Sequence, residues 1–294
     1  MQVSASLIQH LRQVNGHPLS NHRLTGVGGG DINAAYRLQA DGVDWFIKLN
    51  RASLLGMFEA EAAGLRELDS LQQVRVPRVV LYGTRENQAY LVLEYIELGA
   101  LRGDSAARFG QQLANLHRQP RDFFGWPIDN TIGSTPQHNT RHADWPTFWR
   151  QQRLGKQLEF AADNGFTGAL QDKGRKLLEQ IPAFFTTYQP QPALLHGDLW
   201  GGNAASDKQD NPVMFDPACY YGDRETDIAM TELFGGFGQD FQAAYRHEYP
   251  LDPGYQTRKT LYNLYHILNH LNLFGGGYLG QANSMIERLL SELN

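Results

Sequence analysis

The sequence predicts an α+β protein with two lobes: a small N-terminal antiparallel sheet lobe with one key helix, and a larger, mainly helical C-terminal lobe. Two patterns carry this prediction. Up to residue 97, short apolar segments of strand type surround one inserted stretch of helical period. Beyond residue 99, apolar side chains recur mostly at helical spacing. We therefore expect lobes at residues 1–97 and 98–294, joined by a hinge at about 94–99.

The N-terminal lobe begins with residues 3–15, which predict an amphipathic helix packed on the rest of the lobe, with Ser4 or Ser6 as its N-cap. Residues 57–71 predict the inserted helix, because their apolar side chains fall on one face. The turn signal Asp41-Gly42 separates two strands of a meander. Strands are predicted at residues 24–27, 35–38, 44–49, 77–82 and 89–93.

The C-terminal lobe is predicted to be mostly helical, with one short strand at residues 213–215. The first helix, residues 104–118, places His117 on its apolar side. A loop at 125–133 is rich in turn formers. The other helices are predicted at residues 145–160, 168–188, 227–234, 239–247, 254–274 and 279–293.

The composition argues against several classes of protein. The net charge of -5 and the pI of about 6.0 argue against a nucleic-acid binder, which usually has a strongly basic face. The chain has no apolar run near the roughly 20 residues that span a bilayer, and no basic-then-apolar signal peptide. The single cysteine, Cys219, forms no intrachain disulfide and is interpreted as a packing residue. We expect a cytoplasmic protein with no nucleic-acid or membrane partner, and the sequence does not indicate an oligomeric state.

The stretch from His196 to Asn203, followed by Asp216, carries the strongest indication of chemistry. Asp198 and Asn203 lie five residues apart, and Asp216 follows thirteen residues later. An acid that orients a hydroxyl, followed by an amide and a second acid that hold Mg²⁺, is typical of phosphoryl transfer from ATP. Each residue alone could be a cap or a turn residue. Together the three predict Asp198 as the catalytic residue and Asn203 and Asp216 as metal ligands.

Residues of the sheet lobe supply the expected ATP site. Lys48 on an apolar strand is predicted to pair with Glu61 on the inserted helix, in preference to Glu59 or Glu67, and to hold the ATP phosphates. Without that partner, Lys48 would be an edge-strand charge. A glycine-rich loop allows backbone amides to approach phosphates, although such a cluster is often only a flexible turn. The residues of this loop are Gly28, Gly29 and Gly30.

The end of the last strand is the expected adenine site. Extended backbone there would offer the carbonyl of Glu94 and the amide of Ile96 to the base, and the alternative is an ordinary strand end. Two further residues are expected to support the catalytic stretch. The His196 ring would bond to backbone, with a catalytic base as the less favoured reading. Asp227 would act as a helix N-cap, as a brace for the catalytic loop, or as both. A sheet lobe, a helical lobe and these residues indicate a protein-kinase-like fold.

The run Leu194-Leu195-His196-Gly197-Asp198-Leu199-Trp200-Gly201-Gly202-Asn203 resembles the fructosamine/ketosamine kinases, a family within the aminoglycoside-phosphotransferase-like kinases. Its tryptophan makes the pattern narrower than that of the superfamily. Further segments that resemble the family lie at residues 57–65, 124–133, 136–137, 145–154 and 216–230. Some family members are redox-sensitive dimers through a cysteine in the glycine-rich loop. The loop here, residues 28–33, has no cysteine, so such a switch is not supported.

The resemblance implies ATP-dependent phosphorylation of the sugar 3-hydroxyl of a fructosamine or ribulosamine on a protein lysine or free amine. The 3-phosphate makes the adduct labile, so the activity is deglycation. We expect Trp200, together with Trp149 or Arg153, to line the sugar pocket. The alternatives are another small-molecule kinase of this fold, of aminoglycoside, choline or homoserine type, and a nucleotide-binding regulator without turnover. Residues 125–153 carry Arg141, Arg150 and Arg153 beside only two aspartates, which argues against a polycationic aminoglycoside.

Overall fold

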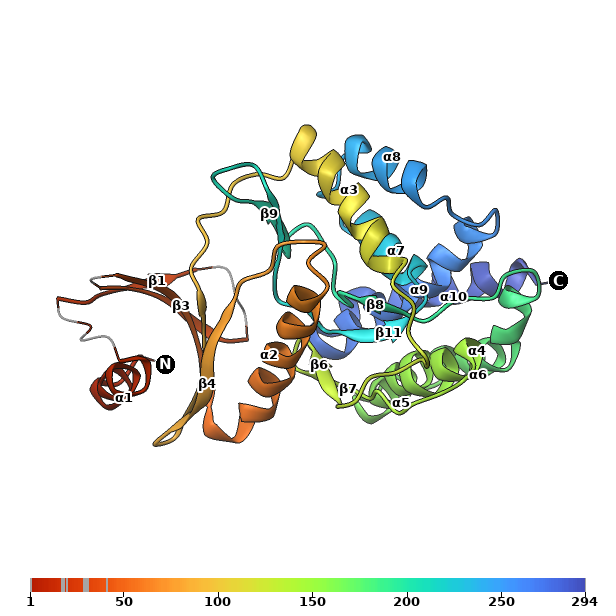
Figure 1. Ribbon diagram of the computed structural model, residues 1–294. Coiled ribbons are helices and arrows are strands. Elements are labelled where there is room, and N and C mark those ends of the chain that lie inside the picture. Colours follow the sequence, from red (N-terminus) through yellow and green to blue (C-terminus); the bar gives the residue numbers. More distant parts are fainter. Residues whose placement is uncertain (1, 17–18, 20, 29–31, 41, 294) are drawn as a thin grey trace.

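The computed structural model describes residues 2–16, 19, 21–28, 32–40 and 42–293, and it has the predicted two-lobed α+β architecture (Figure 1). The N-terminal lobe is an antiparallel sheet with the strand order β1-β2-β3-β5-β4. The predicted strands are all present: β1 Arg23–Val27, β2 Ala34–Ala40, β3 Val43–Arg51, β4 Val79–Arg85 and β5 Gln88–Glu94. β4 and β5 extend into the turn expected at residues 84–88. Only Glu86 and Asn87 connect the two strands, and the positive φ of 53° at Glu86 permits so tight a hairpin.

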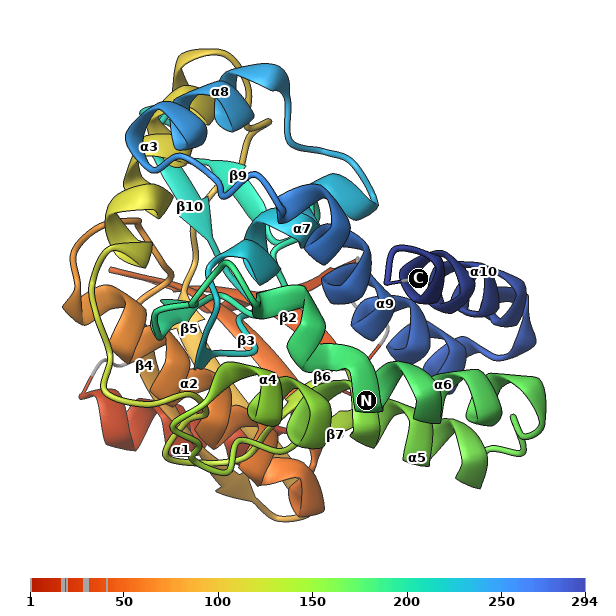
Figure 2. The ribbon, with the colours of Figure 1, turned by 90° about the vertical axis from the view of Figure 1, so that its right-hand side faces the viewer.

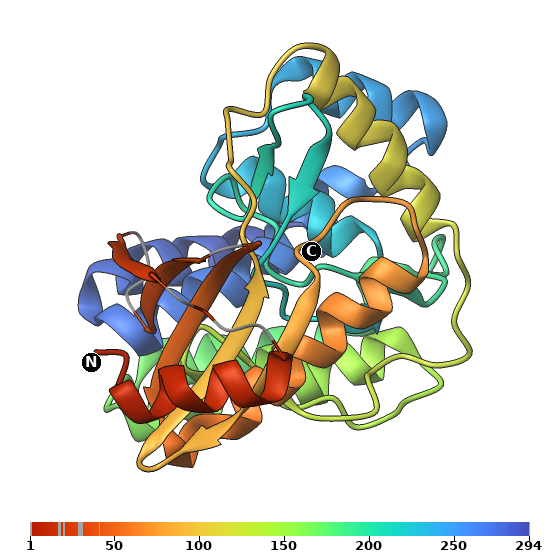
Figure 3. The same cartoon turned by 60° about the vertical axis from the view of Figure 1, so that its left-hand side comes forward.

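One helix covers each face of the sheet: α1 Ala5–Asn15 on the outer face and α2 Leu55–Ser70 on the face toward the C-terminal lobe (Figures 1 and 3). Ser4 is the N-cap of α1, since its Oγ accepts the amide of Leu7 at 3.1 Å. The alternation of side chains along β5 explains the two faces. Tyr90 and Val92 belong to the core with α1, while the intervening Leu91 belongs to the core with α2.

The C-terminal lobe is mainly helical, and its helices pack in pairs, α3 with α8 and α9 with both α7 and α10 (Figure 2). Two predicted helices are divided. A π-helix at Trp149–Leu154 separates α4 from α5, where the amide of Gly155 bonds to the carbonyl of Arg150. The helix expected at 168–188 ends as a 3₁₀ segment at Ile181–Phe185 that contains a proline. The helices are α3 Asp104–His117, α4 Trp145–Phe148, α5 Gly155–Asp163, α6 Ala169–Gln180, α7 Glu225–Leu233, α8 Gln239–Glu248, α9 Tyr255–Phe274 and α10 Leu279–Ser291.

Short strands hold the catalytic stretch in place. β8 Ala193–Leu195 pairs with β11 Tyr220–Gly222, and β9 Ala204–Ser206 pairs with β10 Pro212–Met214. β8 and β9 flank residues 196–203, whereas β10 and β11 flank residues 215–219. The two pairings therefore bring both predicted catalytic segments side by side. Only β10 was predicted as a strand. A further two-stranded hairpin, β6 Asn130–Ile132 with β7 Thr135–Gln137, begins in the loop expected at residues 125–133 and extends beyond it.

Helix α2 joins the two lobes. Its apolar face belongs to the same core as the helices of the C-terminal lobe. Glu67 on α2 accepts hydrogen bonds from Trp126 Nε1 at 2.8 Å and from the Tyr221 hydroxyl at 2.7 Å. The amide of Gly99, the last residue of the expected hinge, bonds to the carbonyl of Ser206 at 2.7 Å. The division at residues 97/98 stays a prediction. No helix in the described part of the chain is long and apolar enough to cross a membrane.

Candidate active site

A cavity of about 1210 Å³ lies between the lobes and brings together most of the predicted site residues. Its walls come from the sheet, from α2, from residues 198–203 and 215–218, from β6 and from α9. The predicted residues that line it are Gly28, Lys48, Glu61, Glu94, Ile96, Asp198, Trp200, Asn203 and Asp216. Gly29 and Gly30 lie outside the described residues.

Asp198 lies in a tight turn that positions its carboxylate. The preceding Gly197 has a φ of +82°, and a side chain there would collide with the carbonyl of Ala218. Asn203 Nδ2 donates to the Asp198 carbonyl oxygen at 2.9 Å and to its Oδ2 at 3.2 Å. Burial, followed by the nearby charge of Asp216, raises the pKa of Asp198 to about 7. A carboxylate with this pKa is well matched to accept a proton near neutral pH.

Asp227 braces the backbone of the catalytic stretch. Its Oδ2 accepts the amide of His196 at 2.8 Å and its Oδ1 accepts the amide of Gly197 at 2.9 Å. The N-cap prediction is wrong, because α7 begins at Glu225 with Arg224 at the cap position, and Asp227 lies inside the first turn. Burial would raise the pKa of Asp227, but its hydrogen bonds and the nearby His117 outweigh burial and lower the pKa.

His117 was not assigned a site role from the sequence, although it contacts Asp227. Its Nε2 lies 3.3 Å from Asp227 Oδ2, and its Nδ1 lies 2.8 Å from the Tyr245 hydroxyl. It lies on the apolar side of α3. A histidine at a core position of that helix is the feature of the sequence that could have indicated this role. Burial lowers the pKa of His117, so the ring fixes Asp227 mainly as a neutral hydrogen-bonding group.

His196 connects the two catalytic segments, as expected for a residue that bonds to backbone. Its Nε2 lies 2.9 Å from the carbonyl oxygen of Phe215, and its Nδ1 accepts the amide of Asp198 at 3.2 Å. Burial lowers the pKa of His196, which favours the neutral ring with the proton on Nε2. Since both ring nitrogens bond to backbone, the geometry does not support His196 as a catalytic base.

Lys48 makes the predicted ion pair and one more. Its Nζ lies 2.7 Å from Glu61 Oε1 and 2.5 Å from Asp216 Oδ1. Burial alone would lower the pKa of Lys48, but the two carboxylates outweigh it and raise the pKa above its usual value. Of the competing acids, Glu59 is exposed and Glu67 bonds elsewhere. The pairing places a permanent cation beside the residues expected to hold the metal.

Asn203 and Asp216 provide a donor set that suits magnesium. The amide nitrogen of Asn203 bonds to Asp198, which leaves its Oδ1 as the oxygen available to a cation. Asp216 adopts a φ of +55°, an unusual conformation for a residue other than glycine. In the described part of the chain, no three His, Cys, Asp or Glu residues form a metal cluster. One amide and one carboxylate therefore fit a cation whose remaining ligands are phosphate oxygens and water.

The residues of the expected adenine site lie in the wall of the cavity. Glu94 and Ile96 both line the cavity where β5 ends. The Glu94 amide bonds to the carbonyl of Arg78 at 2.9 Å, and its carboxylate pairs with Arg75 at 2.7 Å. These contacts hold the strand end in an extended form, and its role in binding the base stays a prediction.

The structure corrects two of the predicted sugar-pocket residues. Trp200 is 42% exposed and lines the cavity. Trp149 and Arg153 do not line it and are only 1% and 0% exposed. Trp149 packs edge-on against Tyr262 with a ring separation of 4.9 Å. The prediction for these two residues is wrong, because the π-helix turns their side chains into the core of the C-terminal lobe.

Arg153 instead holds one wall of the cavity from behind. Its guanidinium donates to the carbonyl of His138 at 2.6 Å and to Asn139 Oδ1 at 2.7 Å, and it lies 4.0 Å from the centre of the Tyr220 ring. Asn139 Nδ2 donates to Asn130 Oδ1 at 2.9 Å. Asn130 lines the cavity and donates to the carbonyl of Cys219, three residues after Asp216. Arg153 is thus two hydrogen bonds away from the cavity wall.

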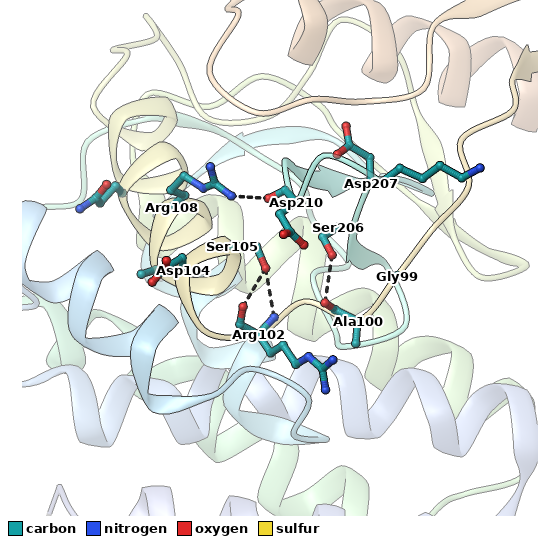
Figure 4. Close-up of a pocket in the computed structure, with 12 residues that line it drawn as sticks. Gly99, Ala100, Arg102, Asp104, Ser105, Arg108, Ser206, Asp207 and Asp210 are labelled. Carbon is teal, nitrogen blue, oxygen red and sulfur yellow. Dashed lines mark hydrogen bonds between the residues drawn. The ribbon is translucent and has the colours of Figure 1, made fainter.

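A second hollow, of about 880 Å³, lies where α3 begins beside the β9–β10 hairpin (Figure 4). Two of its charged groups bond to other parts of the protein. Asp207 pairs with Arg75, and Arg108 donates to the carbonyl of Asp210 at 2.6 Å. Among the described residues that line it, no lysine, amide and carboxylate come together as they do around Asp198. We therefore assign the chemistry to the cavity between the lobes.

Known proteins are similar in sequence to this chain over nearly its whole length. A sequence model of the family described as fructosamine kinase matches residues 3–292. The probable ketoamine kinase of Synechocystis sp. is 46% identical over 97% of this chain and 96% of its own. The chloroplastic protein-ribulosamine 3-kinase of Arabidopsis thaliana is 43% identical over 92% of this chain and 83% of its own.

Solved structures share the architecture. A crystal structure described as a "putative fructosamine-3-kinase" from Haemophilus somnus matches with a TM-score of 0.88 and 29% identity, over 97% of both chains. The streptomycin–ATP–APH(2")-IIa ternary complex matches with a TM-score of 0.65 over 98% of this chain and 97% of its own. At 13% identity, that second likeness shows the fold alone.

Proposed function

The chain belongs to the fructosamine kinase family, and we propose that its cavity phosphorylates the sugar 3-hydroxyl of ketosamines at the expense of ATP. The acceptors are fructosamine or ribulosamine adducts on protein lysines or free amines. Their 3-phosphates are labile, so phosphorylation releases the amine and the activity serves protein deglycation. A cytoplasmic location is part of the same proposal.

The observation that carries this proposal is the meeting of four groups at one point of the cavity. Asp198 is bonded to Asn203, and Lys48 is bonded to Asp216. We assign Asp198 to orient the acceptor hydroxyl and take its proton as the oxygen attacks the γ-phosphorus. ADP then leaves with the electron pair of the broken P–O bond. Lys48, held by Glu61, is assigned to the ATP phosphates.

Asn203 and Asp216 are assigned to hold Mg²⁺, whose chemistry there is to neutralise phosphate charge. We assign the end of β5, at Glu94 and Ile96, to the adenine, and Gly28 with the adjoining loop to the phosphates. Trp200 is assigned to the sugar. His196 and Asp227 hold the Asp198 turn in shape. Catalysis then consists of positioning and charge neutralisation, with no covalent intermediate on the protein.

The test is an ATP-consumption assay with ribuloselysine, fructoselysine, kanamycin and choline as acceptors. We expect turnover with the two ketosamines, and mass spectrometry of the product should show one added phosphate on the sugar. Turnover with kanamycin or choline alone would contradict the proposal and favour another small-molecule kinase. ATP binding without turnover of any acceptor would favour the regulator.

A further inference from the structure

Four aromatic side chains, two exposed and two half-buried, form a cluster in the wall of the catalytic cavity. We call Phe234, His270, Phe274 and Tyr278 the aromatic shelf. His270 is its centre, with ring separations of 4.9 Å to Phe234, 5.4 Å to Phe274 and 5.2 Å to Tyr278. Phe234 is 44% exposed and Phe274 is 60% exposed, which is unusual for side chains of this size. These rings therefore offer an open apolar surface beside the site.

The shelf is continuous with the catalytic stretch. All four residues line the same cavity as Asp198 and Trp200. Phe234 is the C-cap residue of α7 and is followed by Gly235 and Gly236. Gly201 packs so closely against these two glycines that a side chain at Gly201 would meet them at 3.0 Å. The backbone next to Phe234 thus packs against the residue that follows Trp200 in the chain. It belongs to α7, α9 and the residues that follow them, whereas Lys48 and Glu94 belong to the sheet.

We propose that the aromatic shelf binds the amine side of the acceptor, the protonated nitrogen and alkyl chain of a lysine-derived ketosamine. The inference rests on the proposed function and adds the residues that select the amine. A ketosamine nitrogen is a secondary alkylamine and carries a positive charge at neutral pH. The faces of Phe and Tyr rings, here those of Phe234, Phe274 and Tyr278, attract such a cation, and the methylene stem of lysine packs on apolar surface. Trp200 and the shelf line the same cavity, so a sugar held at Trp200 can place its nitrogen on the shelf.

The shelf therefore favours ketosamines of long alkyl amines over those of short ones. Polypeptide bearing the lysine would remain outside the cavity, since the exposed rings of Phe234 and Phe274 face solvent as well as the cavity. Neither the cation nor the alkyl stem needs a carboxylate on the shelf, and its four members supply rings alone. The shelf would therefore recognise the modified lysine side chain rather than the folded protein that carries it.

The experiment compares two ribose-derived adducts that share the sugar and the charged nitrogen. One is the ketosamine of Nα-acetyllysine, and the other is the ketosamine of methylamine, which lacks the alkyl stem. We expect Phe274→Ala to raise the KM for the lysine adduct about tenfold, with a smaller rise for the methylamine adduct and an unchanged KM for ATP. Phe274→Leu, which keeps apolar area but removes the ring, should lie between Phe274→Ala and the parent protein.

Val14→Ala is the matched control, because Val14 is 55% exposed and lies on α1, away from the cavity. Phe234→Ala is a second test, and thermal melts establish that each variant is folded. An equal KM for both adducts in parent and variants would overturn the inference, as would a rise in the KM for ATP, which would place the nucleotide on the shelf. Lack of turnover by the parent protein with any ketosamine would instead overturn the proposed function itself.

Discussion

Lys48 Nζ lies 2.5 Å from Asp216 Oδ1, so a strand of one lobe contacts the assigned metal loop of the other directly. The same ammonium contacts Glu61 at 2.7 Å. One largely buried cation therefore balances two carboxylates, of which Glu61 is buried and Asp216 is half-exposed. When nucleotide and a divalent cation bind, the phosphates would pair with Lys48 and the cation with Asp216, in place of the contact between these two residues.

Lys48→Met is expected to lower kcat/KM for ATP by about 10²- to 10³-fold, because the phosphates lose a fixed positive charge. The variant should also melt at a lower temperature, since Glu61 is left buried without its partner. Steady-state kinetics and thermal unfolding measure the two effects. Lys156→Met is the control, because Lys156 pairs with Glu159 on the surface. Wild-type kinetics in Lys48→Met would contradict the assignment.

Asp198→Asn is expected to lower kcat by about 10²- to 10⁴-fold, the range in which a positioned proton acceptor contributes. ATP should still bind, since the change leaves Lys48 and Asp216 in place. Isothermal titration with ATP and a turnover assay separate the two properties. Asp210→Asn, at an exposed position outside the cavity, is the matched control and should keep full turnover. Equal turnover in the two variants would remove Asp198 from the mechanism.

The same carboxylate predicts how stability depends on pH in the metal-free, nucleotide-free protein. Its pKa is raised from 3.8 to about 7 in the folded state. The folded state then binds the proton more tightly than the unfolded chain, so the contribution of Asp198 to stability is present below about pH 4 and is lost as the pH rises to about 7. Asp198→Asn should therefore melt above wild type at pH 8. The difference should shrink toward pH 4, and a difference independent of pH would contradict the raised pKa.

Two glycines of α2 should respond oppositely to alanine. A side chain at Gly64 would meet Cys219 Sγ at 2.9 Å, whereas one at Gly56 would meet nothing within 4 Å. Gly64→Ala is expected to cost about 1–3 kcal/mol of unfolding free energy and to disturb the segment that follows Asp216. Gly56→Ala should be neutral or stabilise by about 0.5 kcal/mol through helix propensity. Denaturant titration measures both, and similar losses in the two variants would refute the packing argument.

Arg153→Met should lower the unfolding free energy by at least about 2 kcal/mol, because the carbonyl of His138 and the Asn139 side chain lose a buried donor. The KM for the ketosamine should rise while the KM for ATP stays constant, since the network ends at Asn130 in the cavity wall. Arg175→Met, in an exposed ion pair, should change stability by less than about 0.5 kcal/mol. A change in the KM for ATP alone in Arg153→Met would contradict a connection from Arg153 to the acceptor side of the cavity.

The arrangement of the site was largely predictable, because it depends on residue types at short spacings, whereas the roles of these residues stay predictions. Asp198, Asn203 and Asp216 come together because the strands that flank them pair. Lys48 and Glu61 could be paired in advance, since a strand lysine on the helix-facing side must meet the buried face of α2. The spacing of apolar residues in the longer segments likewise predicted the strands of the sheet and most helices.

It was harder to predict whether a given helix face lines the cavity, packs in the core or faces solvent. Trp149 and Arg153 lie at helical spacing in a segment that resembles a substrate region, but periodicity does not distinguish a cavity wall from a core. The π-helix that turns them inward depends on Gly155 and has no sequence period of its own. Phe274 shows the reverse case, because an apolar residue at the end of α9 resembles core and is in fact exposed. The strands β8, β9 and β11 have three residues each, too few to show alternation.

The bonds of Glu67 to Trp126 and Tyr221 bear on how the enzyme exchanges its nucleotide. Rotating one lobe as a rigid body away from the other would break both bonds and part Gly64 from Cys219. The α2 wall is therefore expected to stay closed throughout the catalytic cycle.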